Sequence, residues 1–318
     1  MRTSPATSRA RNLLGASAAL LLGLLATPAC ADILYVTLGN NTIEKITSTG
    51  NRSVFASTGA SPYGLAFDSA GNLYAANKSD NTIEKFTPGG VGSVFASSGL
   101  SSPNGLAFDS AGNLYVANGS FVSNTIEKFT PGGVASLFAS IHQPTGLAFD
   151  SAGNLYAATA SDRTIVKFTP GGAASLFASS GLNFPDGLAF DSAGNLYVAN
   201  FNDNTIEKFA ATGGVLSNSG TVFASTGLNK PLGLAFDSAG ILYAANSAGN
   251  TIEKFSSTGT DLGVFATLTG TSTSPRELAF TNDAGVPLRL ANQVPEPASL
   301  GLLGLGACLL AARRRRRA

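Results

Sequence analysis

The chain has 318 residues, of which 44% are hydrophobic, 12% are charged and 37 are glycine. This composition excludes a disordered, highly charged protein. The formal net charge of +1 provides no basic excess for binding nucleic acid, and two cysteines are too few for a disulfide framework. The length fits one large all-β domain or two ordinary domains.

Residues 1–31 have the layout of a secretory signal peptide. Arginines up to Arg11 precede an apolar run from Leu13 to Leu25, and small residues ending at Ala31 predict cleavage before Asp32. The apolar run is shorter than the roughly 20 residues of a spanning helix, which favours cleavage over an uncleaved anchor. The sequence before Cys30 fits a lipoprotein start poorly. We therefore expect signal peptidase to process an exported chain.

A unit of about 42 residues is repeated between the two ends of the chain. Its first element, Gly64-Leu65-Ala66-Phe67-Asp68, recurs at spacings of 41 to 46 residues. The later copies start at Gly105, Gly146, Gly187, Gly233 and, in altered form, Glu277. Each copy continues into three more β-prone runs, separated by Asp-Ser-Ala-Gly-Asn and Thr-Pro-Gly-Gly turns. Four strands per unit in six units predict an all-β, six-bladed β-propeller of four-stranded antiparallel blades.

The ends of the repeat region predict how the propeller closes. The chain enters in the middle of a unit, at residues 33–36, and ends with β-prone runs at 277–280 and 287–291. The N- and C-terminal strands are therefore expected to share one blade, in a domain covering residues 32–292. Counting residues 288–290 as a further strand gives the alternative of seven blades.

The motif Pro-x-Gly-Leu-Ala-Phe-Asp-Ser-Ala-Gly-Asn-Leu-Tyr-Val-Ala-Asn resembles NHL repeats and the related gluconolactonase-like six-bladed propellers. The resemblance covers residues 33–292, whereas the absence of tryptophan disfavours WD-type propellers. Many functions share this scaffold, so the resemblance specifies a fold and not an activity.

The resemblance implies that ligands bind at the rim of the central channel, at the residue before each first-strand glycine. These rim residues are Tyr63, Asn104, Thr145, Asp186, Leu232 and Arg276. Gluconolactonase-like enzymes hold a divalent cation there with a glutamate, an asparagine and an aspartate. Asn104 and Asp186 match two of these motifs, but Thr145 separates them and Glu277 is one residue out of register. We expect Asn104 and Asp186 to be ordinary turn residues and the protein to hold no cofactor. The alternative is Ca²⁺ or another divalent cation bound by Asn104, Asp186 and Glu277.

Three other polar features have simple structural interpretations. His142, the single histidine, is a catalytic candidate, as is Asp186, but the local sequence around His142 indicates neither a nucleophile nor a buried orienting acid. The polar loop 78–81 is expected to be a solvated hairpin tip. The repeated Glu-Lys pairs, such as Glu84-Lys85, should point to opposite sheet faces and protect the outer edges from aggregation.

Residues 293–318 contain Val294-Pro295-Glu296-Pro297, an apolar run from 298 to 312, and arginines 313–317. This order resembles the PEP-CTERM sorting signal of Gram-negative bacteria. It implies a short transmembrane helix, recognition by an exosortase and delivery to the cell surface or extracellular matrix. A plain tail anchor is the alternative.

The charge balance changes once the two ends are set aside. Setting aside residues 1–31 and 293–318 removes eight arginines and Glu296, so 12 basic residues face 18 acidic ones, a net charge of −6 that disfavours binding to polyanions. We expect an exported binding or structural module, linked to exopolysaccharide or biofilm. It would pass through an inner-membrane intermediate to the cell surface or medium, touching the membrane only through its terminal segments. Its partners would be polysaccharide or surface proteins and not nucleic acid. The alternatives are a metal-dependent, lactonase-like hydrolase and passive exported cargo.

Overall fold

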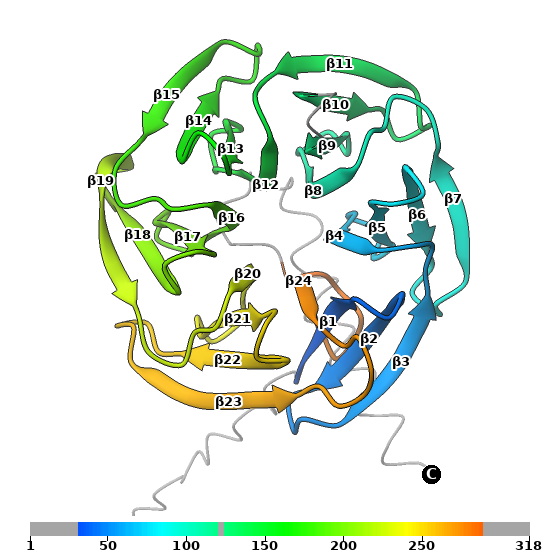
Figure 1. Cartoon of the computed structure of the whole chain (residues 1–318). Helices are drawn as coiled ribbons and strands as arrows, with labels where there is room; N and C mark the ends of the chain where they lie inside the picture. The colour runs from blue at the N-terminus through cyan, green and yellow to red at the C-terminus, as the bar shows by residue number, and fades with distance from the viewer. Residues whose placement is uncertain (1–30, 120–123, 289–318) are drawn as a thin grey trace, which may run out of the picture.

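The computed structural model describes residues 31–119 and 124–288, which form a ring of six four-stranded antiparallel sheets around a central channel (Figure 1). This arrangement confirms the predicted all-β, six-bladed propeller. Within the described ranges there is no helix, and hence none long and apolar enough to cross a membrane. The predicted signal peptide, sorting motif and transmembrane helix lie outside these ranges.

Each blade has one strand in each of four positions, from the channel outwards. The innermost strands are β4 (Pro62–Phe67), β8 (Pro103–Phe108), β12 (Pro144–Phe149), β16 (Pro185–Phe190), β20 (Pro231–Phe236) and β24 (Pro275–Asn282). The second strands are β1 (Asp32–Leu38), β5 (Leu73–Asn77), β9 (Leu114–Gly119), β13 (Leu155–Thr159), β17 (Leu196–Asn200) and β21 (Leu242–Asn246). The third are β2 (Thr42–Thr47), β6 (Thr82–Phe86), β10 (Asn124–Phe129), β14 (Thr164–Phe168), β18 (Thr205–Thr212) and β22 (Thr251–Phe255). The outermost are β3 (Arg52–Ser57), β7 (Gly92–Ala96), β11 (Ala135–Ser140), β15 (Ala174–Ala178), β19 (Val215–Ala224) and β23 (Asp261–Thr267).

The N- and C-terminal strands close the ring as the sequence predicts. One sheet has the order β24-β1-β2-β3, in which Leu34 of β1 pairs with Phe280 of β24. A strand from the end of the chain thus completes a blade begun by the first strand, which leaves no open seam in the ring.

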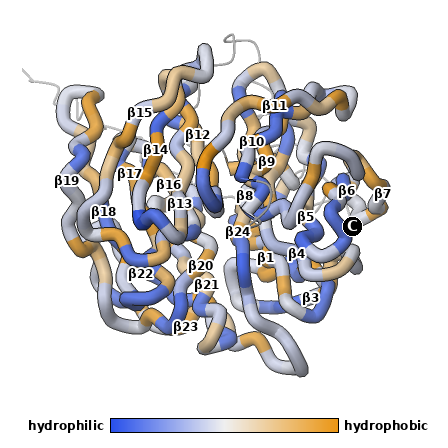
Figure 2. Tube along the Cα trace, turned by 45° about the horizontal axis from the view of Figure 1, so that its top comes forward, coloured by the Kyte–Doolittle hydropathy of each residue, from blue (hydrophilic) through white to orange (hydrophobic). Residues whose placement is uncertain are grey.

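The hydrophobic core is divided among the interfaces between blades. Second strands such as Leu73–Asn77 are buried at every residue, because one neighbouring blade covers each face. Tyr74 packs edge-to-face against Phe95 and Phe108, with ring centroids 5.1 and 4.9 Å apart. Equivalent aromatic contacts occur at the other interfaces, and hydrophobic stretches run through every blade (Figure 2). Edge-to-face aromatic pairs stabilise the blade interfaces beyond what the burial of apolar area alone contributes.

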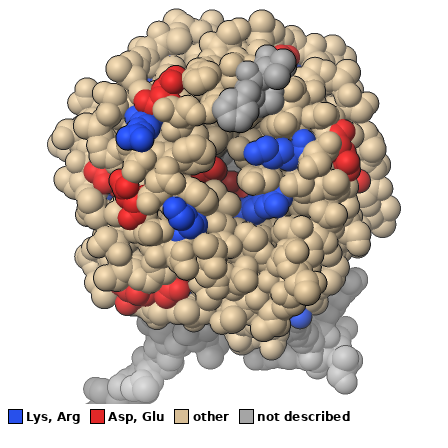
Figure 3. All heavy atoms as spheres, in the orientation of Figure 1, with Lys and Arg blue, Asp and Glu red and all other residues tan. Residues whose placement is uncertain are grey.

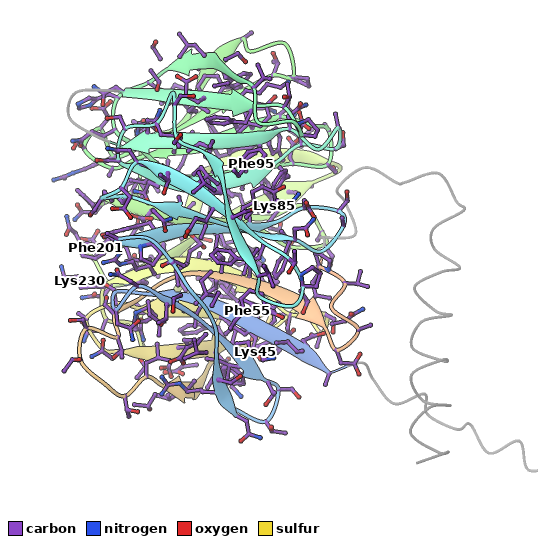
Figure 4. All side chains as sticks on the ribbon, turned by 90° about the vertical axis from the view of Figure 1, so that its right-hand side faces the viewer. Lys45, Phe55, Lys85, Phe95, Phe201 and Lys230 are labelled. Carbon is purple, nitrogen blue, oxygen red and sulfur yellow. The ribbon has the colours of Figure 1, made fainter. Side chains whose placement is uncertain are left out.

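The two ends of the channel open on different faces of the molecule. On the turn face, the Asp-Ser-Ala-Gly-Asn turns join the innermost strands to the second strands. The rim face lies at the opposite end, where the innermost strands begin at their prolines. Residues 32 and 282 pair at the turn face, so the described chain begins there, and β24 also ends there. Figure 4 shows Phe201 and Lys230 on the opposite side of the molecule, at the rim face.

The aspartate of each repeated turn holds the turn together. In the first copy, Asp68 Oδ1 accepts hydrogen bonds from the backbone N–H groups of Ala70 and Asn72, both at 2.9 Å. Its Oδ2 accepts from Asn72 Nδ2 at 2.8 Å and from the Tyr74 hydroxyl at 3.2 Å. The turn is therefore fixed by one carboxylate, which also orients a core tyrosine.

Asp68→Ala is expected to lower the free energy of unfolding by about 2 kcal/mol, because it leaves two backbone N–H groups and a tyrosine hydroxyl without their acceptor. Chemical denaturation measures the loss. The neighbouring Ser69 is exposed, so Ser69→Ala is a matched control that should leave stability unchanged. Equal losses in the two variants would contradict this account of the turn.

Candidate functional site

The beginnings of the six innermost strands form the rim of the channel. A buried proline opens each strand, and the residue after it stands at the rim. Next comes a glycine in five of the six blades. A Cβ atom at any of these glycines would overlap the carbonyl oxygen of the rim residue in the next blade. The affected pairs are Gly64 with Asn104, Gly105 with Thr145, Gly146 with Asp186, Gly187 with Leu232 and Gly233 with Arg276. The strands therefore approach so closely that the rim residues converge.

Glu277 occupies the position that is glycine in the other five blades. Its backbone N–H donates to Thr37 Oγ1 at 3.0 Å, and the Thr37 hydroxyl donates to the Tyr63 carbonyl oxygen at 2.7 Å. Oε1 of Glu277 accepts from the N–H of Leu278 at 3.2 Å and lies against Gly233, where a Cβ would come within 2.7 Å of it. Burial, with a contribution from the negative charge of Asp186, raises the pKa of Glu277 to about 8.

Asn104 and Asp186 are more than nine-tenths buried, with exposed fractions of the whole residue of 6% and 7%. Neither side chain has a hydrogen-bond or ion-pair partner among the residues that the structure describes. Burial raises the pKa of Asp186 to about 6, although the positive charge of Lys78 opposes this shift. Their polar atoms are not among the fully buried side-chain atoms that lack a hydrogen-bond partner, so they keep contact with solvent and can meet polar groups of a ligand.

Two cations lie against the same aromatic ring at the rim. Lys78 Nζ is 4.3 Å and the Arg276 guanidinium carbon 4.1 Å from the centroid of the Tyr63 ring. Nη1 of Arg276 also donates to Ser61 Oγ and to the Pro62 carbonyl oxygen, both at 2.9 Å, which fixes the guanidinium. Neither cation forms an ion pair within 4 Å among the described residues. Figure 3 shows acidic atoms in a hollow at the centre of this face, with basic side chains around it.

The other candidate residues have different surroundings. Thr145 Oγ1 donates to the Pro185 carbonyl oxygen at 2.9 Å, and Leu232 is a buried apolar side chain. His142 Nδ1 lies 2.8 Å from Asp162 Oδ1, within hydrogen-bond distance, and both side chains are about half exposed. The nearby Ser161 hydroxyl bonds Gln143 instead of His142. His142 thus has no nucleophile beside it in this loop.

The loop at residues 78–81 differs from the expected solvated hairpin tip. Lys78 is half-buried over Tyr63, and burial lowers its pKa, whereas Ser79 and Asp80 are exposed as expected. The sequence pattern does not identify Lys78 as a rim residue, because the repeat marks only the first-strand positions and Lys78 follows a second strand. It also missed Thr37, although a signal existed: the other five second strands have alanine at this position.

A divalent cation does not fit this rim. The negative charge of Asp186 acts on Glu277, but the positive charge of Lys78 already acts on Asp186, and Arg276 adds a second positive charge close to Lys78. The described residues contain no group of three or more histidine, cysteine, aspartate or glutamate side chains arranged to hold a metal ion. A hard cation prefers several convergent anionic oxygens without competing cations.

Comparisons with known proteins agree with the architecture and identify the C-terminal tail. The PEP-CTERM protein-sorting motif matches residues 293–317, and the NHL repeat matches residues 182–209. The sorting motif indicates membrane-anchored export to the cell surface, with processing by an exosortase. No curated protein sequence is significantly similar to the chain.

Several solved structures share the fold at low sequence identity. A nidogen/laminin complex contains a chain that is 19% identical, with a TM-score of 0.70, covering 79% of this chain and 99% of that one. A gluconolactonase from Xanthomonas campestris is 19% identical, with a TM-score of 0.63 and coverage of 79% and 92%. Virginiamycin B lyase from Staphylococcus aureus is 16% identical, with a TM-score of 0.55 and coverage of 79% and 82%. These similarities extend to the fold alone.

Proposed function

We propose that this protein is a surface-sorted binding module whose channel rim holds a small hydroxylated carboxylate, such as a uronic acid unit of an extracellular polysaccharide. In this proposal, residues 1–31 are removed on export, residues 32–292 form the binding domain and residues 293–318 carry the sorting signal. The sorting motif supports the location, and the geometry of the rim supports the ligand class.

The observation that carries the proposal is the pair of cations on Tyr63, facing a buried carboxylate across the channel. Tyr63 and Asp186 belong to blades on opposite sides of the ring, and Lys78 is close enough to Asp186 to affect its pKa. Lys78 and Arg276 suit a carboxylate, since charge-assisted hydrogen bonds are the stronger ones. Asn104 and Asp186 remain available for ligand hydroxyl groups.

The local charge of the rim differs from that of the whole domain. At pH 7, Glu277 is mostly protonated because its pKa is about 8, whereas Asp186 is mostly ionised because its pKa is about 6. Together with Lys78 and Arg276, the rim then carries one net positive charge. The acidic excess of the domain therefore does not prevent an anion from binding at this position.

Calorimetric titration with glucuronate, and with glucose as the neutral analogue, tests the proposal. We expect the wild-type protein to bind glucuronate and not glucose. Lys78→Met should weaken glucuronate binding about tenfold or more, because it removes a charged hydrogen bond. Lys230→Met is the matched control, since Lys230 also lies over an aromatic ring at the rim face, Phe201, at 4.9 Å. Equal affinity in both variants, or no binding by the wild type, would overturn the proposal.

A lactonase-like hydrolase is the second candidate, because Asp186 and Glu277 are buried carboxyl groups with raised pKa values. Such groups suit a general base. A Ca²⁺-dependent rise in unfolding temperature, together with lactone hydrolysis lost in Asp186→Asn, would establish this candidate over the binding module. The poor fit of a divalent cation predicts neither result.

A further inference from the structure

One blade carries an aromatic pair at the rim face that the proposed ligand site does not use. In each described blade, the N–H of the residue after the second strand donates to the carbonyl oxygen of the residue before the innermost proline. These six pairs are Gly39–Ser274, Lys78–Ser61, Gly119–Ser102, Ala160–Gln143, Phe201–Phe184 and Ser247–Lys230. Only the pair in the blade of β16 and β17 is aromatic, so this blade departs from the repeat at both positions.

The equivalent pair in the blade of β4 and β5 already belongs to the rim site. Ser61 Oγ accepts a hydrogen bond from Arg276 Nη1 at 2.9 Å, and Lys78 Nζ lies 4.3 Å from the centroid of the Tyr63 ring. Side chains at these two positions therefore contact residues of the rim, although neither position lies on an innermost strand.

The aromatic pair lies on the side of the ring that faces this charged blade across the channel (Figure 1). Phe184 is separated from Asp186 by Pro185 alone, so their Cα atoms are at most about 7 Å apart. The rim thus has a charged side with Lys78 and an aromatic side with Phe184, and Asp186 stands beside the aromatic side.

Phe184 is both exposed and held in an uncommon backbone conformation. It is 38% exposed, and its φ of 54° lies in the left-handed region, which bulky residues rarely adopt. The equivalent Ser61 and Ser102 have the same conformation with a much smaller side chain. A single exposed phenylalanine is ordinary, but one at a strained position beside a candidate site indicates a role in binding.

The residues behind Phe184 hold its ring in place. The centroids of the Phe184 and Phe201 rings are 5.8 Å apart, with the ring planes tilted by 49°. Lys230 Nζ in turn lies 4.9 Å from the centroid of the Phe201 ring, on the rim face (Figure 4). Phe201 is therefore covered by its neighbours, and Phe184 is the ring that remains open to a ligand.

We propose that the Phe184 ring is a stacking subsite for a neutral sugar unit linked to the uronic acid held by Lys78 and Arg276. This inference rests on the proposed function and adds a second unit to its ligand. One face of a pyranose ring carries polarised C–H groups, which are attracted to the negative face of an aromatic ring. The same negative face repels a carboxylate, so the stacked unit is a neutral sugar.

The arrangement of the rim gives the ligand a direction across the channel. The carboxylate of the uronic acid meets the charged side, and the neutral unit meets the aromatic side, where Asp186 can accept from its hydroxyl groups. Because the two units are covalently linked, binding of the first raises the effective concentration of the second at Phe184. A disaccharide should therefore bind more tightly than either sugar alone.

Calorimetric titration with glucuronate, and with a disaccharide of glucuronate and glucose, tests the proposal. We expect the wild-type protein to bind the disaccharide about tenfold more tightly than glucuronate, as stacking on one aromatic ring typically contributes. Phe184→Ser should abolish this gain and leave glucuronate affinity unchanged. The substitution suits the backbone, because serine occupies the equivalent positions 61 and 102.

Two further variants and a second measurement separate stacking from a general loss of structure. Phe184→Tyr keeps an aromatic ring and should retain the gain. Val91→Ala is the matched control: Val91 is 71% exposed but follows a turn at the opposite end of the channel, so both affinities should be unchanged. In NMR spectra of the bound disaccharide, the glucose-ring C–H protons should shift upfield with the wild type and not with Phe184→Ser. Circular dichroism shows whether each variant is folded.

The outcomes distinguish this subsite from the proposed function on which it rests. Glucuronate binding without a gain for the disaccharide, or an equal gain in folded Phe184→Ser, would overturn the stacking subsite and leave the rim site intact. Disaccharide binding that depends on Phe184 and not on Lys78 would support the subsite and contradict the proposed carboxylate site. Failure of the wild type to bind either sugar would overturn both.

Discussion

Gly146→Ala is expected to lower the free energy of unfolding by about 3 kcal/mol, because overpacking against backbone cannot be relieved by rotating a side chain. The added Cβ would overlap the Asp186 carbonyl oxygen and come within 3.0 Å of the carbonyl carbon. Gly146 is one of five glycines with this contact, so the blades of the ring would have to separate locally. Denaturation with guanidinium measures the loss.

Gly171→Ala is the matched control for this substitution. Gly171 lies in a Thr-Pro-Gly-Gly turn, and a Cβ there meets only Thr169 Oγ1 at 3.9 Å. Its backbone is also outside the left-handed region, so alanine fits without strain. We expect an unchanged or slightly higher stability, since alanine restricts the unfolded chain. A loss in Gly171→Ala equal to that in Gly146→Ala would show that close approach at the rim is not the cause.

The repeat pattern predicts the fold because it contains the local information for each blade. Turn chemistry at Asp68 and its equivalents fixes where strands end, and a regular unit length fixes the number of blades. Closure follows from the partial units at the two ends. The position of the rim also follows from the sequence, because the proline and glycine flank the same residue in each unit.

The chemistry of the rim is predicted less completely, because it depends on contacts between distant residues. Lys78 and Arg276 meet over Tyr63 only after the ring closes, although they are far apart in the chain. Local sequence therefore assigned Lys78 to a solvated loop. The sequence shows that Glu277 is one residue out of register with the metal-ligand motif. That Glu277 takes the place of a closely packed glycine becomes clear only from the contacts between neighbouring blades.

Glu277→Gln is expected to remove the pH dependence of the free energy of unfolding that arises from the Glu277 carboxyl group at the rim. The pKa of Glu277 is raised from an ordinary 4.5 to about 8 in the folded protein, so folding favours the protonated carboxyl group. The stabilisation that comes from the protonated Glu277 carboxyl group is fully present below pH 4.5 and is lost as the pH rises towards 8. Above that pH the ionised, buried carboxylate destabilises the fold by on the order of 5 kcal/mol.

Glutamine keeps the shape of the side chain without its charge, so Glu277→Gln should be more stable than the wild type at pH 9 and similar to it at pH 4.5. Urea denaturation across this range measures the two curves. Glu44→Gln provides the contrast, because Glu44 is ion-paired with Arg52 at 2.8 Å and its replacement should lose stability instead of gaining it. If Glu277→Gln were destabilising at pH 9, the carboxylate at this glycine position would hold the ring together. The ionised carboxylate would then stabilise the fold, so its pKa could not be raised by burial. The net positive charge inferred for the rim at pH 7 would be wrong.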